Sequence, residues 1–190
     1  MRETNPKRRI VVAVTGASGS LYARLLCGRL AASEAVGEIA LIVTGNGRRV
    51  AAYEDRIDWM DDPRYTLYDD GDLFGAPASG SARYDAMAVV PCSMGMAGRI
   101  ASGVSDSLAS RAADVMLKER RRLVFVVRET PLSLIHLRNM TALTEAGAVI
   151  LPACPSFYAG AQDVEALCGT VADRAVALLG VDAEHYEWGE

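Results

Sequence analysis

The stretch Ile10-Val11-Val12-Ala13-Val14-Thr15-Gly16-Ala17-Ser18-Gly19 decides the fold. Its continuous apolar, β-branched run predicts a strand covered on both faces, as is typical of a parallel sheet. The glycines at 16 and 19 predict a tight turn, and residues 20–33 carry leucines at helical spacing. A strand, a glycine turn and a helix in this order predict the first part of a βαβ unit.

The same alternation continues along the chain. We expect strands at residues 10–15, 39–44, 87–91, 123–127 and 148–151. We expect helices at residues 20–33 and 48–55, over a long region ending near 118, and at 132–146 and 164–179. This pattern predicts an α/β fold, with a parallel sheet flanked by helices in one Rossmann-like domain over residues 1–190. Residues 56–84 break the rhythm and are interpreted as a long loop or excursion, and residues 181–190 as a C-terminal tail.

Composition excludes several classes of protein. Of 190 residues, 51% are hydrophobic, which excludes a disordered chain, and the net charge of −4 argues against nucleic-acid binding. No apolar run approaches the roughly 18 residues that a membrane span needs. The basic start followed by a short apolar run is interpreted as a first strand rather than a signal peptide, because a glycine turn closes it. Four scattered cysteines and two histidines give no zinc spacing or disulfide framework, so we expect a cytoplasmic protein.

Small and hydroxyl-bearing residues follow most of the expected strands. In an open parallel sheet, ligands bind beyond the carboxyl ends of the strands. Glycines let a backbone approach a ligand closely, and helix N-termini offer free N–H groups to an anion. This edge therefore predicts a site for a phosphate-bearing ligand. The segments concerned are Thr15-Gly-Ala-Ser-Gly-Ser20, Thr44-Gly-Asn-Gly47, Pro91-Cys-Ser-Met-Gly95, Arg128-Glu-Thr-Pro131 and Pro152-Ala-Cys-Pro-Ser156.

Each of these signals also has a purely structural interpretation. The glycine turn matches neither a complete dinucleotide motif nor a P-loop, so it is also explained as a tight strand–helix connection. Arg128 and Glu129 are also explained as an ion pair beside Thr130, an expected helix N-cap followed by Pro131. The basic run at residues 118–122 complements a helix dipole.

Two further constellations are disfavoured. Asp69, Asp70 and Asp72 could suggest magnesium, but a glycine interrupts the cluster and it lies in an expected loop, so we expect no metal site. Cys92 and His136 could form a nucleophile and base, but His136 lies on an apolar helix and is better explained as a hydrogen-bonded, partly buried histidine.

Several longer motifs resemble the UbiX family of flavin prenyltransferases. Residues 111–123 resemble its R-A-A-D-V-x-L-K-E-R-R segment, and residues 128–140 resemble R-E-T-P-L followed by I-H-L-x-N-M. Together the matching segments extend over nearly the whole chain. The others are Gly16-Ala-Ser-Gly19, Pro77-Ala-Ser-Gly-Ser81, Pro91-Cys-Ser93, Gly147-Ala-Val-Ile-Leu-Pro152 and Pro155-x-Phe-Tyr158.

The resemblance implies a flavodoxin-like flavoprotein that assembles into trimers and then a homododecamer. It implies an enzyme of the prenyl-transferring class that joins the dimethylallyl group of dimethylallyl monophosphate to N5 and C6 of reduced FMN, without a metal. The prenylated FMN would then serve a UbiD-type decarboxylase. Two alternatives are an FMN-dependent cysteine decarboxylase of the same fold and a non-catalytic flavin carrier.

The resemblance also assigns roles to individual residues. FMN would be held by Gly16, Ala17, Ser18, Thr44, Ser93, Met94, Gly95, Met96 and Arg128. The prenyl phosphate would meet Lys118, Arg128, Glu129, Tyr158 and Arg174. Ser18 and Glu54 match proton-handling positions, and Trp188 matches a C-terminal tryptophan. Because Lys118 is distant in sequence from the strand ends, a neighbouring subunit could bring it to the site.

The chain departs from the family pattern at a few positions. Gly45 stands where a lysine is common, Leu73 where some members have tryptophan, and residues 159–161 replace His-Arg-Pro. These differences bear on the shape of the pocket and on the preference for a prenyl donor. The cysteine decarboxylases use a histidine on the helix after the first flavin loop, and residues 20–33 contain none.

Overall fold

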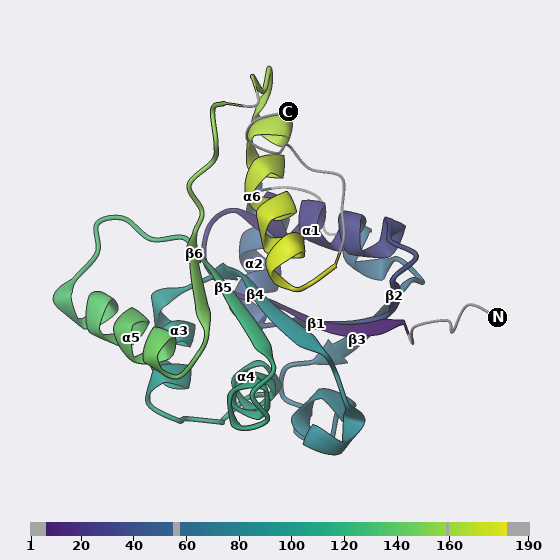
Figure 1. The fold of residues 1–190 in the computed structure, drawn as a ribbon, viewed down its shortest axis with the longest axis vertical. Coiled ribbons are helices and arrows are strands. Elements are labelled where there is room, and N and C mark those ends of the chain that lie inside the picture. The colour runs from purple at the N-terminus through teal and green to yellow at the C-terminus, as the bar shows by residue number, and fades with distance from the viewer. Residues whose placement is uncertain (1–6, 55–57, 159, 182–190) are drawn as a thin grey trace.

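The computed structural model describes residues 7–54, 58–158 and 160–181. Within them, six strands form one sheet in the order β3-β2-β1-β4-β5-β6, and every neighbouring pair is parallel (Figure 1). The strands are β1 (Arg8–Val14), β2 (Val36–Val43), β3 (Tyr65–Asp69), β4 (Ala86–Cys92), β5 (Arg122–Val127) and β6 (Val149–Pro152). The strand order reverses at β1, which has β2 on one side and β4 on the other, and such a switch point is where α/β sheets bind ligands.

Helices cover both faces of the sheet because successive strand residues point to opposite sides. Ile10, Val12 and Val14 of β1 pack in one core with α1, α2 and α6, whereas Val11 and Ala13 pack in another with α3, α4 and α5. The helices are α1 (Ser20–Ala32), α2 (Gly45–Glu54), α3 (Met94–Ala101), α4 (Leu108–Lys118), α5 (Leu134–Glu145), α6 (Val164–Leu178) and the 3-10 helices η1 (Asp58–Asp61), η2 (Ala76–Ala78) and η3 (Gly80–Ala82). The expected α/β fold is confirmed.

Two features differ from the sequence interpretation. The segment at residues 56–84 is not only a loop, because it contains the edge strand β3. The five expected strands alone would lie in the flavodoxin order, and β3 extends that sheet beyond β2. The long helix expected to end near residue 118 is two helices, because Gly103 takes a positive φ of 71° and Ser107 caps a new helix, α4.

The helix after β5 also begins later than expected. Ser133, not Thr130, is the N-cap of α5. The Ser133 hydroxyl accepts the His136 N–H at 3.2 Å, and His136 Nδ1 accepts the Ser133 N–H at 3.2 Å. His136 is therefore a partly buried residue that helps to cap α5, in agreement with the prediction of a hydrogen-bonded, partly buried histidine.

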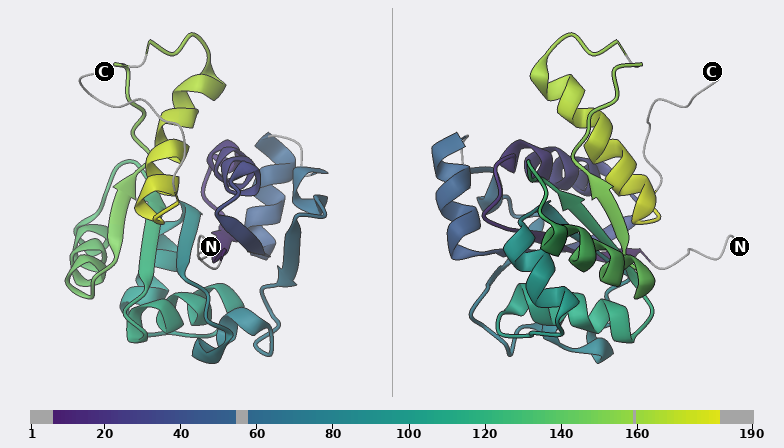
Figure 2. Two further views of the ribbon diagram at one scale, coloured as in Figure 1. Left: turned by 45° about the vertical axis from the view of Figure 1, so that its right-hand side comes forward. Right: turned by 90° about the vertical axis from the view of Figure 1, so that its left-hand side faces the viewer.

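The segment between β6 and α6, together with the first turns of α6, extends away from the rest of the domain (Figures 1 and 2). Phe157 and Tyr158 on this segment are 77% and 74% exposed. None of the helices in the described ranges has the length and apolarity that a bilayer span requires.

Candidate functional site

The turn after β1 is shaped by Gly19 and closed by Glu54. Gly19 has a φ of 106°, a left-handed conformation that favours glycine, and directly precedes α1. The Glu54 carboxylate at the end of α2 accepts the Gly19 N–H at 2.8 Å and the Ser20 N–H at 2.9 Å. A side chain of the protein thus already occupies the anion position at the N-terminus of α1.

Glu54 also interacts with the Ser18 hydroxyl, one of the predicted catalytic pair. Partial burial of the Glu54 carboxyl raises its pKa, but the hydrogen bonds from Ser18, Ser20 and Gly19 outweigh this effect and lower it. The structure therefore brings the two predicted proton-handling residues together, with Glu54 as a carboxylate.

Thr15 ties the turn after β1 to the turn after β4. Its buried hydroxyl donates to the Pro91 carbonyl at 2.7 Å and accepts the Ser93 N–H at 2.9 Å. Because the hydroxyl donates one hydrogen bond and accepts another at the end of β4, Thr15 fixes the position of Ser93 relative to Gly16.

The turn after β2 also packs tightly against the end of β1. The Thr44 hydroxyl accepts the Gly47 N–H at 3.0 Å and so caps the first turn of α2. A Cβ on Gly47 would lie 2.5 Å from the Val14 carbonyl oxygen, and one on Gly16 would lie 2.7 Å from Asn46 Cβ. Glycine at both positions is therefore what allows α2 to start directly beside the end of β1.

A cleft of about 620 Å³ opens where these turns meet. At its edge, the Ser93 hydroxyl caps α3 by accepting the Met96 N–H at 3.3 Å. The first N–H groups of α2 and α3 have no carbonyl partner within their own helices, so two helix N-termini offer donors here. The residues that line the cleft are Thr15, Gly16, Thr44, Gly45, Asn46, Asp70, Ser93, Gly95, Met96, Arg99, Asp106 and Ser107.

Of the predicted FMN-binding residues, five line this cleft, namely Gly16, Thr44, Ser93, Gly95 and Met96. Ser18 is exposed in the turn after β1, and Ala17 and Met94 are buried beside the cleft. Arg128 follows β5, where its Nε donates to the Ser18 carbonyl at 3.1 Å. That contact connects the end of β5 to the first glycine turn and shows why an arginine follows a buried strand.

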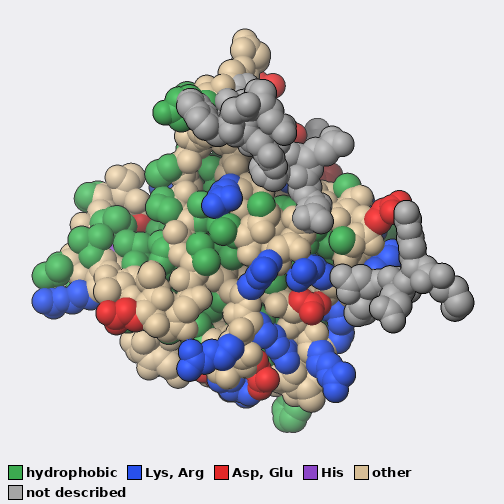
Figure 3. Space-filling model, viewed as in Figure 1, with side chains coloured by type: hydrophobic (Ala, Val, Ile, Leu, Met, Phe, Trp, Pro, Cys, Tyr) green, Lys and Arg blue, Asp and Glu red, His purple; other side chains and the backbone are tan. Residues whose placement is uncertain are grey.

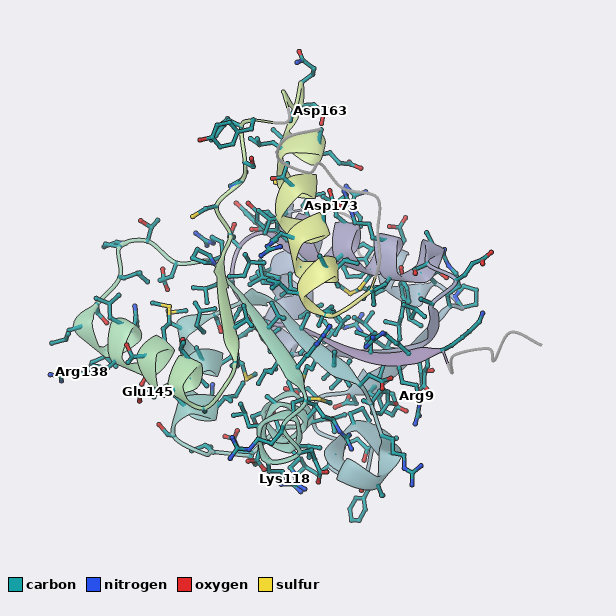
Figure 4. The ribbon with its side chains drawn as sticks, viewed as in Figure 1. Arg9, Lys118, Arg138, Glu145, Asp163 and Asp173 are labelled. Carbon is teal, nitrogen blue, oxygen red and sulfur yellow. The ribbon has the colours of Figure 1, made fainter. Side chains whose placement is uncertain are left out.

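The predicted prenyl-phosphate residues are more widely spread. Glu129 is exposed next to Arg128 and accepts the Thr130 N–H at 3.0 Å. Tyr158 lies on the extended segment before α6, and Arg174 is exposed on α6. Lys118, labelled in Figure 4, ends α4, which leads into the amino end of β5. The cleft lies at the other end of the strands, beyond their carboxyl ends. The Lys118 Nζ lies 2.6 Å from a carboxylate oxygen of Glu119. Trp188 lies outside the described residues.

Cys92 is unsuited to nucleophilic chemistry in this structure. Its side chain is fully buried at the end of β4, and this burial raises the pKa of the thiol to about 12. The thiol is therefore neutral at physiological pH, and a neutral thiol is a poor nucleophile. The burial of Cys92 and the capping role of His136 both argue against a catalytic Cys92–His136 pair, which the sequence also disfavours.

Sequence reasoning missed some residues that line the cleft. Asn46 and Asp70 lay within quoted segments without a role. Arg99, Asp106 and Ser107 lay in the long helical region expected to end near residue 118, for which no break was predicted. The three aspartates at residues 69–72 organise the local backbone. Asp70 Oδ1 accepts the Ala109 N–H at 2.9 Å, and Asp69 and Asp72 accept N–H groups two residues ahead.

Apolar side chains gather on the outer side of α5 and β6, as Figure 3 shows at the left of the molecule. Leu134, Ile135 and Leu137 of α5 are 61%, 68% and 46% exposed, and Val149 of β6 is 38% exposed. We refer to these four residues as the α5–β6 surface. Several exposed apolar side chains beside an edge strand are typical of a protein–protein contact.

A doubly wound sheet with a cleft of about 620 Å³ at its switch point is typical of α/β proteins that bind nucleotide-like ligands. A family described as Flavoprotein matches residues 1–176, so the chain is a flavoprotein. The chain belongs, within that class, to the UbiX family of flavin prenyltransferases. It is 38% identical over 184 residues to the flavin prenyltransferase UbiX of Methanocaldococcus jannaschii, covering 95% of this chain and 98% of the relative.

Two solved structures agree with this assignment. The crystal structure of AnUbiX (PadA1) in complex with FMN and dimethylallyl pyrophosphate superposes with a TM-score of 0.88 at 42% identity, covering 97% of this chain and 100% of that one. A dodecameric FMN-dependent UbiX-like decarboxylase from Escherichia coli O157:H7 gives a TM-score of 0.89 at 34% identity, covering 94% and 98%.

Proposed function

We propose that this protein transfers the dimethylallyl group of dimethylallyl monophosphate to N5 and C6 of reduced FMN and releases prenylated FMN for a UbiD-type decarboxylase. The observation that carries the proposal is the cleft at the ends of β1, β2 and β4 in a chain similar to flavin prenyltransferases along almost its whole length. The relative with FMN and a dimethylallyl ligand supports both substrate classes.

The cleft fits a flavin phosphate. A Cβ on Gly45 would meet no atom within 4 Å, so the start of α2 faces open space. The Thr44 and Ser93 hydroxyls and the N-termini of α2 and α3 supply hydrogen-bond donors for an anion there. We assign the flavin to residues 16–18, 44, 93–96 and 128, in keeping with the family resemblance.

The second substrate needs cationic groups. When bound, reduced FMN supplies the nucleophilic N5 and C6, and the prenyl phosphate leaves. Lys118, Arg128 and Arg174 neutralise the charge that develops on the departing phosphate, and for this reason we propose a reaction without a metal. The Tyr158 hydroxyl would donate a hydrogen bond to the phosphate, and Glu129, beside Arg128, completes the set.

We assign proton transfer to Ser18 and Glu54. Bonding of N5 and C6 to the two ends of the allyl group would release one proton from each of these flavin atoms and use up the prenyl double bond, which takes one proton back; the other leaves with the phosphate. A group that accepts and returns a proton is therefore needed close to the flavin turn, where the Ser18 hydroxyl already contacts the Glu54 carboxylate. Ser18 relays the proton and Glu54, or the released phosphate, receives it. The lowered pKa of Glu54 keeps it in the ionised form that can accept a proton.

Completion of this site requires other copies of the chain. Lys118 lies near the amino end of β5, whereas the cleft lies at the carboxyl ends of the strands. The Lys118 side chain therefore does not reach the flavin site of its own copy. We propose a trimer-based homododecamer in which the α5–β6 surface is buried between copies, and a neighbouring copy supplies Lys118. The dodecameric relative supports this assembly.

The two alternatives lack supporting observations. A cysteine decarboxylase of this fold would need a histidine on α1, and Ser20–Ala32 contains none. A flavin carrier would need no second anion site, which leaves Lys118, Glu129, Tyr158 and Arg174 without a role.

The test is the mass of the flavin product. Reduced FMN and dimethylallyl monophosphate are incubated anaerobically with the purified protein after chelation of metals, and the flavin is analysed by mass spectrometry. We expect FMN heavier by one prenyl group. A parallel reaction with dimethylallyl pyrophosphate determines which donor is used. An unchanged flavin mass in both reactions, with FMN bound to the protein, would favour the carrier instead.

A further inference from the structure

Arg99 on α3 is the one Lys or Arg among the described residues that line the cleft. It stands one helical turn after Gly95, so its side chain can reach back toward the N-terminus of α3. It does so: Arg99 Nη1 lies 3.9 Å from the position that a Cβ on Gly95 would take. The guanidinium therefore lies beside the first turn of α3, next to the cleft.

From this placement we infer that Arg99 binds the 5′-phosphate of FMN and makes the cleft selective for FMN over riboflavin. The inference rests on the proposed flavin function, but no sequence motif or family resemblance pointed to Arg99. The Thr44 and Ser93 hydroxyls and the two helix N-termini surround the same cleft, so a phosphate there meets neutral donors and one full positive charge.

Two carboxylates also line the cleft, and both have partners. Asp70 Oδ1 accepts the Ala109 N–H in the first turn of α4, where the helix dipole stabilises negative charge. Asp106 Oδ2 lies 3.5 Å from Arg99 Nε, and Ser110 donates to its other oxygen at 3.4 Å. The ion pair therefore engages Nε and positions the guanidinium, while Nη1 is the atom that approaches Gly95. Both side chains of the pair are about half exposed, so the ion pair alone contributes little to stability.

The chain contains a matched control for Arg99. Arg49 on α2 follows Gly45 by the same four residues, and α2 also begins at the cleft. Arg49 does not line the cleft, and no atom lies within 4 Å of a Cβ built on Gly45. Arg49→Gln thus removes the same charge at the same helical spacing without removing the contact.

The experiment compares FMN and riboflavin binding to flavin-free protein by titration of flavin fluorescence. We expect Arg99→Gln to weaken FMN binding on the order of 10- to 100-fold and to leave riboflavin binding within about twofold, because the lost contact is a charge-assisted hydrogen bond to the phosphate. Arg99→Lys, which keeps the charge but not the guanidinium geometry, should fall between. Arg49→Gln should bind both flavins like the wild type.

Three outcomes would overturn the assignment of Arg99. These are unchanged FMN affinity in Arg99→Gln, equal losses for FMN and riboflavin, and an equal loss of FMN affinity in Arg49→Gln, which would indicate long-range charge. Riboflavin binding reports on the integrity of the fold in each variant. A wild-type protein that binds neither flavin would overturn the proposed function and this inference together.

Discussion

The two proposed anion-binding regions of this protein are built in different ways. The cleft forms within one chain, because three parallel strands end side by side and the helices α2 and α3 begin there. The proposed prenyl-phosphate region includes Lys118, which precedes the amino end of β5, and Glu129, which follows its carboxyl end. It also includes Arg174 of α6 and Tyr158 of the segment before it. The first region follows from the fold of one chain, whereas in our proposal the second becomes a site only in an assembly.

This difference separates two functions that one chain must perform. We propose that a single copy can hold FMN with residues that its own core keeps in place, such as Thr15, which links β1 to the end of β4. It cannot surround the leaving phosphate with all of its proposed ligands. Coupling the second anion site to assembly would ensure that only the assembled protein activates the prenyl donor.

Removal of the Lys118 side chain is the strongest test of the difference between the two proposed regions. We expect Lys118→Ala to lower the rate of prenyl transfer about 100-fold or more, because the charge on the departing phosphate loses a preorganised cation. FMN affinity should stay within about twofold of the wild type, because Lys118 lies away from the cleft. Single-turnover flavin mass analysis and flavin titration measure the two effects, and a comparable loss of both would mean that Lys118 belongs to the flavin site.

Mixed assemblies test whether Lys118 acts in a neighbouring copy. Lys118→Ala and Ser18→Ala carry defects in different parts of the proposed site. When the two are co-expressed, some sites combine an intact flavin turn with an intact Lys118 from another copy, so transfer activity should recover above that of either variant alone. Activity that stays at the level of the single variants would place Lys118 and Ser18 of one copy in the same site.

A second way to sharpen the comparison is to block the assembly itself. Ile135 is 68% exposed on the α5–β6 surface, so Ile135→Asp should leave the folded chain intact but place a charge in the proposed contact. We expect a smaller particle by light scattering and a loss of prenyl transfer of more than about tenfold, with FMN binding retained. Leu67→Asp is the matched control, because Leu67 is exposed on β3, the edge strand at the other side of the sheet from β6. An unchanged particle mass in Ile135→Asp would exclude this surface from the assembly.

The sequence predicts the cleft better than its surroundings for a physical reason. Buried apolar strands and glycine turns are local signals, so the positions of Gly16, Thr44 and Ser93 follow from the pattern alone. The edge strand β3 is short and half exposed, and therefore lacks the continuous apolar run of a central strand. The proposed role of Arg99 depends on the N-termini of α2 and α3, which come together only in the folded chain. No local sequence pattern indicates this arrangement.

Within the cleft, a smaller effect is expected from Thr15. Thr15→Val keeps the shape of the side chain but leaves the Pro91 carbonyl and the Ser93 N–H without their partner, at a cost of about 1–3 kcal/mol in the free energy of unfolding. Because Ser93 then loses its fixed position, we expect FMN affinity to fall about tenfold. Thr15→Ser, which keeps the hydroxyl, should bind FMN nearly as the wild type does. Chemical denaturation and flavin titration provide the two readouts, and equal behaviour of the two variants would contradict the role of the hydroxyl.

The smallest effect concerns the carboxylate that caps α1. The folded-state pKa of Glu54 is lowered from 4.5, chiefly through hydrogen bonds that overcome its burial, so its contribution to stability is present above pH 4.5 and is lost as the pH falls through the folded-state value. Glu54→Gln should therefore reduce the free energy of unfolding by about 0.5–1 kcal/mol at pH 7, a modest value because the carboxylate is exposed and Gln retains an acceptor oxygen. The difference between wild type and variant should shrink toward zero under more acidic conditions, where both side chains are neutral. Urea unfolding across this pH range measures it, and a difference that persists in acid would mean that Glu54 stabilises the turn by packing rather than by charge.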